Sequence, residues 1–172
     1  MDLKTRPAPP TDSERAAVAS VLGPEQPRQL HVVSGGHLNK ARRHLLLPTL
    51  HAVNDRVGWI SSTAIDHIAE RLDVSPAEVY GVASFYALFA LTARDPHQVH
   101  VCIDLACRAN GGATARDLPA GSHAAPCLGL CERAPAALVI EAGDPVQRSV
   151  AGHVSAAEIG RASCRERVLR LV

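Results

Sequence analysis

Apolar residues recur with helical spacing from about residue 37 to residue 95. In "LLLPTLHAVNDRVGW" they are separated by four, three and four positions, which places them on one face of a helix. These positions are Leu46, Leu50, Val53 and Val57. Pro48 fits the first turn of this helix, where its missing N–H has no intrahelical partner to lose. The stretch "SSTAIDHIAERLDV" repeats the pattern through Ile65, Ile68, Ala69 and Leu72.

A third helix is marked by its start. Ser75-Pro76-Ala77-Glu78 is a capping box with proline at the first helical position. We expect this helix to run on through Tyr80, Val82, Phe85 and Phe89. Three such helices packed on each other predict a small N-terminal three-helix bundle.

The pattern changes to strands from Gln98 onward. "QVHVCI" alternates, and "AALVIEAGDPVQRSVAG" has two short strands around a Gly-Asp-Pro turn. Ser155-Ala156-Ala157-Glu158 is a second capping box and opens a C-terminal helix. This half is therefore α+β, as is the chain.

Three stretches follow from these patterns. Residues 1–36 are rich in proline and polar residues and predict a flexible N-terminal lead with one short helix over Asp12–Leu22. Residues 37–95 form the helical bundle, and residues 96–172 form the α+β domain. An apolar content of 47% with 20% charged residues is typical of a globular protein.

Charge and hydropathy exclude two classes of partner. A net charge of +1 gives no electrostatic basis for binding nucleic acid, and 3% aromatics provide few stacking platforms. The uncharged stretch from Val79 to Ala93 has 15 residues, fewer than the roughly 20 needed to span a bilayer. With no apolar secretory segment at the N-terminus, we expect a cytoplasmic protein, or one bound peripherally to the inner membrane within a complex.

Four cysteines form two spaced pairs. "VCIDLACRANGG" holds Cys102 and Cys107, and "PCLGLCERAP" holds Cys127 and Cys131. In a reducing compartment such pairs more often bind metal than form structural disulfides. Four thiolates select zinc or an iron–sulfur cluster, and a four-residue gap followed by a distant second pair is closer to cluster spacings than to zinc ribbons. Spacing alone leaves open zinc, unconnected buried thiols and a redox-active disulfide.

The remaining chemistry-bearing residues give weaker signals. Glycines accompany the cysteines and allow backbone N–H groups to approach sulfur closely. His123 lies near Cys127 and is the one candidate to tune or replace a ligand, as in Rieske-type centres. Cys164 in the tail is interpreted as a bystander. No nucleotide-binding or nucleophile motif is visible, so we expect no complete active site on this chain.

The motif "CLGLCERAP" resembles the C-L-G-x-C-x-x-A-P motif of the thioredoxin-like 2Fe–2S subunit in the NADH-oxidising module of respiratory complex I. Relatives of that subunit occur in NAD-dependent formate dehydrogenases and NAD-reducing hydrogenases. "LLPTLHAVNDRVGWIS" followed by "AEVYGVASFYALF" is similar to the N-terminal bundle of the same family, and the similarity extends over about residues 38–160.

The resemblance implies a thioredoxin-like 2Fe–2S ferredoxin domain after the bundle, with Cys102, Cys107, Cys127 and Cys131 as ligands of one cluster. It implies an electron-transfer subunit of an NAD(H)-dependent oxidoreductase, of the complex I, formate dehydrogenase or hydrogenase type. FMN and NAD would bind a flavoprotein partner, and Tyr80, Phe85 and Tyr86 would serve mainly the core and partly that contact. The alternative is a structural or assembly subunit that docks on the flavoprotein with a zinc-bound or empty cysteine site.

The sequence departs from the family between the cysteine pairs. Only 19 residues separate Cys107 from Cys127, fewer than the family usually has. We therefore expect a shortened central segment, with its helix short or absent and the central strand after it weak.

Overall fold

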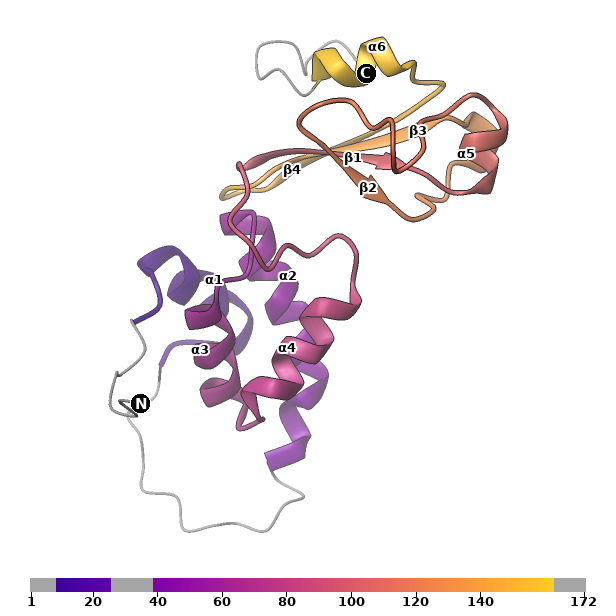
Figure 1. Cartoon of the computed structure of the whole chain (residues 1–172). Helices are drawn as coiled ribbons and strands as arrows, with labels where there is room; N and C mark the ends of the chain where they lie inside the picture. The colour runs from indigo at the N-terminus through magenta and orange to yellow at the C-terminus, as the bar shows by residue number, and fades with distance from the viewer. Residues whose placement is uncertain (1–8, 26–38, 163–172) are drawn as a thin grey trace, which may run out of the picture. The chain divides into compact units, whose positions relative to one another are not determined.

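The computed structural model describes residues 9–25 and 39–162 (Figure 1). These residues fall into two compact units, with the boundary between Ala93 and Arg94. The first unit is helical, and the second combines a four-stranded sheet with two helices. The predicted α+β class is therefore correct. The predicted boundary after residue 95 lies two residues beyond the one in the structure.

The helical unit contains α1 (Asp12–Leu22), a 3-10 helix η1 (Asn39–Leu45), α2 (Leu46–Val57), α3 (Ser62–Leu72) and α4 (Pro76–Phe85). Side-chain caps explain where three of them begin. Thr11 and Glu14 form a capping box at α1, Ser61 accepts a hydrogen bond from the N–H of Ala64 at α3, and Ser75 accepts one from the N–H of Glu78 at α4. The predicted short helix over residues 12–22 is confirmed.

The core of this unit draws on all four α-helices. Its most deeply buried members include Val18 of α1, Leu50 and Val53 of α2, Ile68 of α3 and Val79 of α4. Since α1 supplies part of this core, residues 12–22 are not a flexible lead. They belong to the helical unit.

Helix α4 differs from its prediction in length and in orientation. Its buried residues are Val79 and Ala83, one turn apart, so Tyr80 and Phe85 lie on its exposed side. The helix ends at Phe85 because Tyr86 takes extended backbone angles, φ −91° and ψ 118°. Phe89 reaches the core from the loop that follows, so its predicted position on the helix is wrong.

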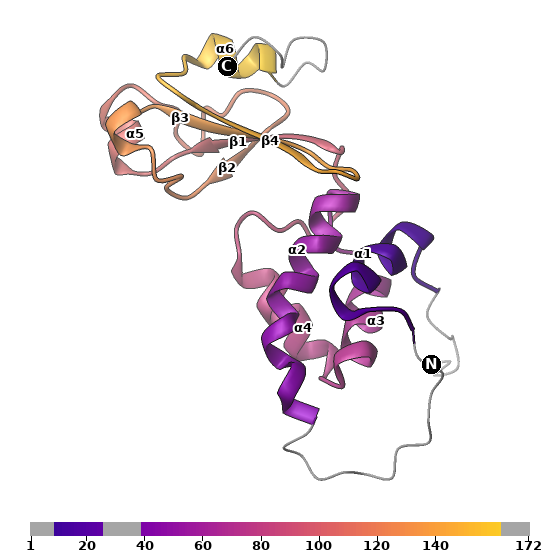
Figure 2. The same ribbon diagram turned by 180° about the vertical axis from the view of Figure 1, so that it is seen from behind.

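The sheet of the second unit has the strand order β2-β1-β3-β4 (Figure 2). Strand β1 (His97–Cys102) pairs in parallel with β2 (Ser122–Ala125) and antiparallel with β3 (Ala136–Glu141), which pairs antiparallel with β4 (Gln147–Gly152). Helix α6 (Ala156–Ala162) covers one face, where its Ile159 packs on Val99, Val101 and Val139. The predicted strands and C-terminal helix are confirmed.

The short segment between β1 and β2 still forms the expected elements. Helix α5 (Leu105–Ala109) is present but has only five residues. Strand β2 has four residues and lies at the sheet edge, so the expected weak central strand is an edge strand. In the part of the chain that the structure describes, no helix has the length and apolarity to cross a bilayer.

Candidate metal centre

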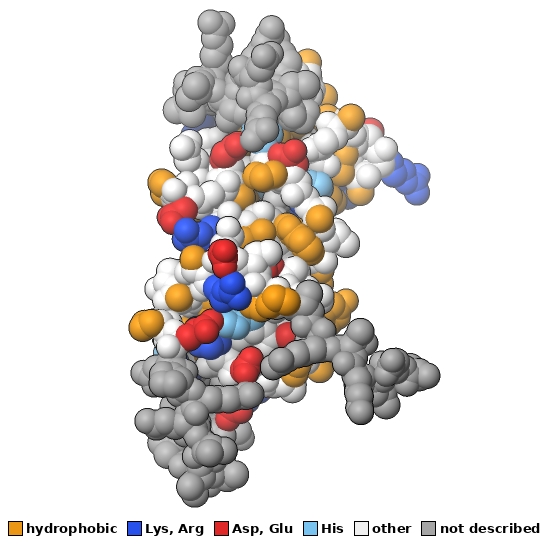
Figure 3. Space-filling view, turned by 90° about the vertical axis from the view of Figure 1, so that its left-hand side faces the viewer, with side chains coloured by type: hydrophobic (Ala, Val, Ile, Leu, Met, Phe, Trp, Pro, Cys, Tyr) orange, Lys and Arg blue, Asp and Glu red, His pale blue; other side chains and the backbone are white. Residues whose placement is uncertain are grey.

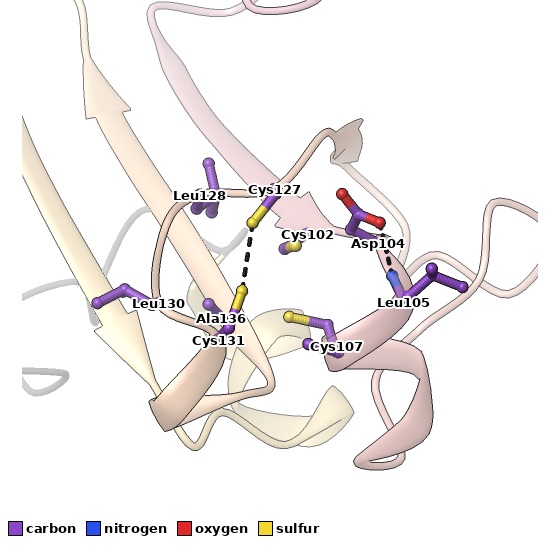
Figure 4. Close-up of a pocket in the computed structure, with 10 residues that line it drawn as sticks. Cys102, Asp104, Leu105, Cys107, Cys127, Leu128, Leu130, Cys131 and Ala136 are labelled. Carbon is purple, nitrogen blue, oxygen red and sulfur yellow. Dashed lines mark hydrogen bonds between the residues drawn. The ribbon is translucent and has the colours of Figure 1, made fainter.

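Four neighbouring parts of the second unit bring the four cysteines to one pocket (Figure 4). Cys102 is the last residue of β1, Cys107 lies on α5, Cys127 follows β2, and Cys131 opens the 3-10 helix η2 (Cys131–Arg133). All four line one pocket of about 210 Å³. The other lining residues are Asp104, Leu105, Ala106, Leu128, Leu130 and Ala136.

The first pair is positioned by the turn from β1 into α5. The Asp104 side chain accepts a hydrogen bond from the N–H of Leu105 at 2.7 Å and so caps the helix. Helix α5 then turns the chain back, and Cys107 points towards the end of β1, where Cys102 lies (Figure 4). The pair therefore depends on a tight strand-to-helix turn.

The second pair is positioned by a loop next to the same strand end. Parallel pairing places Ala125 of β2 beside Cys102, so the loop with Cys127 begins near the first pair. Gly129 has φ +78°, a left-handed conformation that costs glycine little, and it reverses the chain between the two cysteines. The Sγ atoms of Cys127 and Cys131 are 3.4 Å apart.

The two pairs differ in burial. Cys102 and Cys107 are each 2% exposed and pack against Ala134 and Ala136, whereas Cys127 and Cys131 are exposed. Burial, and then a hydrogen bond with the Cys102 thiol, raises the pKa of Cys107 to about 11. A hydrogen bond with Cys127 is the main cause that raises the pKa of Cys131. A neighbouring thiol thus contributes to both shifts, after burial at Cys107 and as the main cause at Cys131, and a bound cation would favour the thiolate form of each.

The four thiols can be compared with the ligand sets of known metal groups. Within residues 9–25 and 39–162, no three or more His, Cys, Asp or Glu side chains are gathered as the ligands of one metal ion. The thiols instead form two pairs around one pocket. Four thiolates in two pairs match the donor set of a two-iron cluster, with two ligands for each iron, and four thiolates also form the donor set of structural zinc sites. The residues present therefore fit a 2Fe–2S cluster.

Another candidate from the sequence, His123, lies away from the pocket. His123 is on β2 with its ring centroid 5.5 Å from that of His100, and it is not among the residues that line the pocket. Cys164 lies outside the described residues. The cysteine pattern does not by itself predict the apolar wall formed by Leu128, Leu130 and Ala136. The two leucines that flank Gly129 in "CLGLC" were the available signal.

Comparison with known proteins finds a family that matches part of the chain. Residues 36–118 match the model of the thioredoxin-like [2Fe-2S] ferredoxin. This match includes Cys102 and Cys107 but ends before Cys127. The second pair therefore depends on its motif and on its place in the pocket.

Curated relatives agree with the family model. The chain is 35% identical over 72 residues to NADH-quinone oxidoreductase subunit 2 of Thermus thermophilus, covering 42% of this chain and 40% of the relative. It is 30% identical over 66 residues to NADP-reducing hydrogenase subunit HndA of Solidesulfovibrio fructosivorans, covering 38% and 39%. It is 32% identical over 111 residues to mitochondrial NADH dehydrogenase [ubiquinone] flavoprotein 2 of Dictyostelium discoideum, covering 55% and 45%.

These matches span less than half the length of each of the three relatives. The matched region nevertheless contains most of the helical unit and the first cysteine pair. Residues 36–118, somewhat less than half of the chain, thus match the thioredoxin-like [2Fe-2S] ferredoxin family, which the motifs of the chain also resemble.

Proposed function

We propose that this chain is an electron-transfer subunit of an NAD(H)-linked oxidoreductase complex and that Cys102, Cys107, Cys127 and Cys131 hold a 2Fe–2S cluster. The observation that carries the proposal is the convergence of both cysteine pairs on one pocket in a chain that matches this family over residues 36–118. The names of the relatives, which are subunits of NADH and NADP oxidoreductases, support the same role. When bound, such a cluster accepts and releases one electron at a time.

The chain's own residues prepare the site in two ways. The thiol groups supply four soft ligands from two segments, so that neither segment alone completes the set. Leu128, Leu130 and Ala136 form an apolar wall behind them, and this wall limits the access of water on one side. The exposed pair, Cys127 and Cys131, leaves the other side open to a redox partner.

The purified chain provides the direct test. We expect a brown protein with roughly two irons per chain and an electron paramagnetic resonance (EPR) signal after reduction. Cys127→Ser should weaken or abolish the signal while far-UV circular dichroism stays unchanged, because Cys127 is exposed and adds little to the core. A colourless protein with one zinc, or with no metal, would instead indicate the structural or assembly role.

A flavoprotein subunit that binds NADH and FMN is the partner we propose. Tyr80, Phe85 and Tyr86 form what we call the aromatic patch, and they are 54%, 81% and 40% exposed. The rings of Phe85 and Tyr86 meet edge to face at 5.3 Å. Their expected role in the core is wrong, because the buried side of α4 carries Val79 and Ala83. Exposed aromatic side chains of this size are enriched where proteins bind each other.

The aromatic patch can be tested apart from the cysteines. Phe85→Ala and Tyr80→Ala should reduce co-purification with the flavoprotein without changing the iron content of the chain. Val150→Ala is the matched control, since Val150 of β4 is also apolar and 52% exposed. Equal co-purification of all three variants would exclude the patch as the docking surface. The face in Figure 3 shows acidic and basic side chains interspersed, with no large region of a single sign.

A further inference from the structure

Gly112 follows α5, and the structure leaves no room there for a side chain. A Cβ atom on Gly112 would lie 2.6 Å from the carbonyl oxygen of Cys107, 2.9 Å from its carbonyl carbon and 3.2 Å from Cβ of Pro135. The nearest of these separations is about 0.8 Å short of ordinary van der Waals contact at 3.4 Å. The two nearest atoms belong to the backbone, so they cannot move aside as a flexible side chain would.

Hydrogen bonds account for this close approach. The N–H of Gly112 donates to the carbonyl oxygen of Cys107 at 2.8 Å, and the N–H of Asn110 donates to the same oxygen at 3.2 Å. Pro135, on the other side of Gly112, lies four residues after Cys131. Gly112 therefore lies between the backbone of one cysteine and the segment that leads away from the other pair.

Gly152 holds a corresponding position at the end of β4. A Cβ atom there would lie 2.6 Å from Cβ of Arg133 and 2.7 Å from its carbonyl oxygen. The N–H of His153 donates to that oxygen at 2.7 Å, and the N–H of Val154 donates to the carbonyl oxygen of Pro135 at 3.1 Å. The end of β4 thus fixes the backbone just after Cys131.

We propose that Gly112 and Gly152 are positioning residues that set the separation of the two cysteine pairs. The inference rests on the proposed function, because the separation matters only if both pairs hold one group. Metal–ligand distances must be met within roughly 0.2 Å. A displacement of about 0.8 Å, which alanine at Gly112 would require, is several times that tolerance. The buried Cys107 would move with Gly112, and the turn that begins at Cys131 would move with Gly152.

Three alanine variants of the whole chain test the inference. Gly112→Ala and Gly152→Ala should shorten the half-life of the cluster in excess chelator by roughly tenfold or more, the range seen when groups that support metal ligands are altered. The EPR spectrum and the midpoint potential should also change, which a loss of general stability alone would not cause. Gly143→Ala is the matched control, since its nearest neighbour is the carbonyl oxygen of Pro145 at 3.7 Å. It should behave as the unmodified chain does.

The outcomes separate this inference from the proposed function. An unmodified chain that takes up no iron overturns both. A chain that carries the cluster, with an unchanged half-life and spectrum in the folded alanine variants, overturns the positioning role alone. Circular dichroism without iron checks folding. The two glycines lie against different cysteine segments, so a loss of folding in one variant leaves the other to decide.

Discussion

Cys107 should be alkylated slowly in the metal-free chain. Burial and the Cys102 thiol raise its pKa from an ordinary value of 9.0 to about 11. A raised pKa keeps a thiol neutral to higher pH, and only the thiolate is alkylated. At pH 8 the thiolate fraction falls tenfold for each pKa unit, which amounts to about 100-fold here. Exposure of only 2% slows the reaction further.

Pulsed alkylation with iodoacetamide, read by mass spectrometry, measures this difference. The reference is Cys107 itself in the urea-unfolded chain, where its pKa returns to the ordinary value. We expect the native rate at pH 8 to be at least about 100-fold lower than that reference. The exposed Cys127 should be alkylated early in the same sample.

The pH profile and one variant make the test strict. Between pH 8 and pH 9.5 the native rate at Cys107 should rise about tenfold per pH unit without levelling off, because its pKa lies near 11. Cys102→Ala removes the hydrogen-bond partner and should accelerate alkylation of Cys107. A rate that levels off near pH 9, or that equals the unfolded rate, would refute the reasoning.

Three further predictions concern stability. Leu50→Ala, at a side chain with 0% exposure, should lower the free energy of unfolding by about 2 to 5 kcal/mol in urea titrations. Glu14→Ala should lower the free energy of unfolding by about 2 to 3 kcal/mol, because buried Glu14 accepts hydrogen bonds from the N–H of Thr11 at 2.7 Å and from the Ser61 hydroxyl. Asp12→Ala is the control and should change the Tm little, because the Asp12 side chain is 96% exposed. Burial, and then His123 and Arg94, lowers the pKa of His100 to about 4. Between pH 6.5 and pH 4 the unfolded chain therefore binds a proton that the folded chain does not, and about 3 kcal/mol of stability should be lost over that range. His100→Leu should reduce that loss.

Local signals in the sequence were sufficient for most elements. The predicted capping residues Ser75 and Ser155 both lie at helix starts, because a hydroxyl that accepts a backbone N–H acts within three residues. The cysteine motif likewise predicts two pairs, and both line one pocket. Such features depend on neighbours in sequence, and a single sequence contains them.

Features that depend on distant contacts could not be predicted in the same way. The sequence pattern of α4 is apolar on every side, so periodicity could not show that Val79 would be buried and Phe85 exposed. Strand β2 lies at an edge because of its pairing with β1, which no spacing within "RANGGATARDLPAGSHAAP" specifies. The close approach of Gly112 to Cys107 likewise appears only once the turn is built.

The brevity of α5 has a consequence for how the site is filled. A helix of five residues closes barely more than one turn and has almost no stability of its own in water. Before iron arrives, this turn should open briefly in a small minority of molecules, which would give an incoming carrier access to the two inner thiols while leaving Cys107 protected most of the time. Amide hydrogen exchange at residues 105–109 should therefore slow sharply when the chain is loaded, while exchange in β3 changes little. Loading with iron would then complete the folding of the turn from β1 into α5.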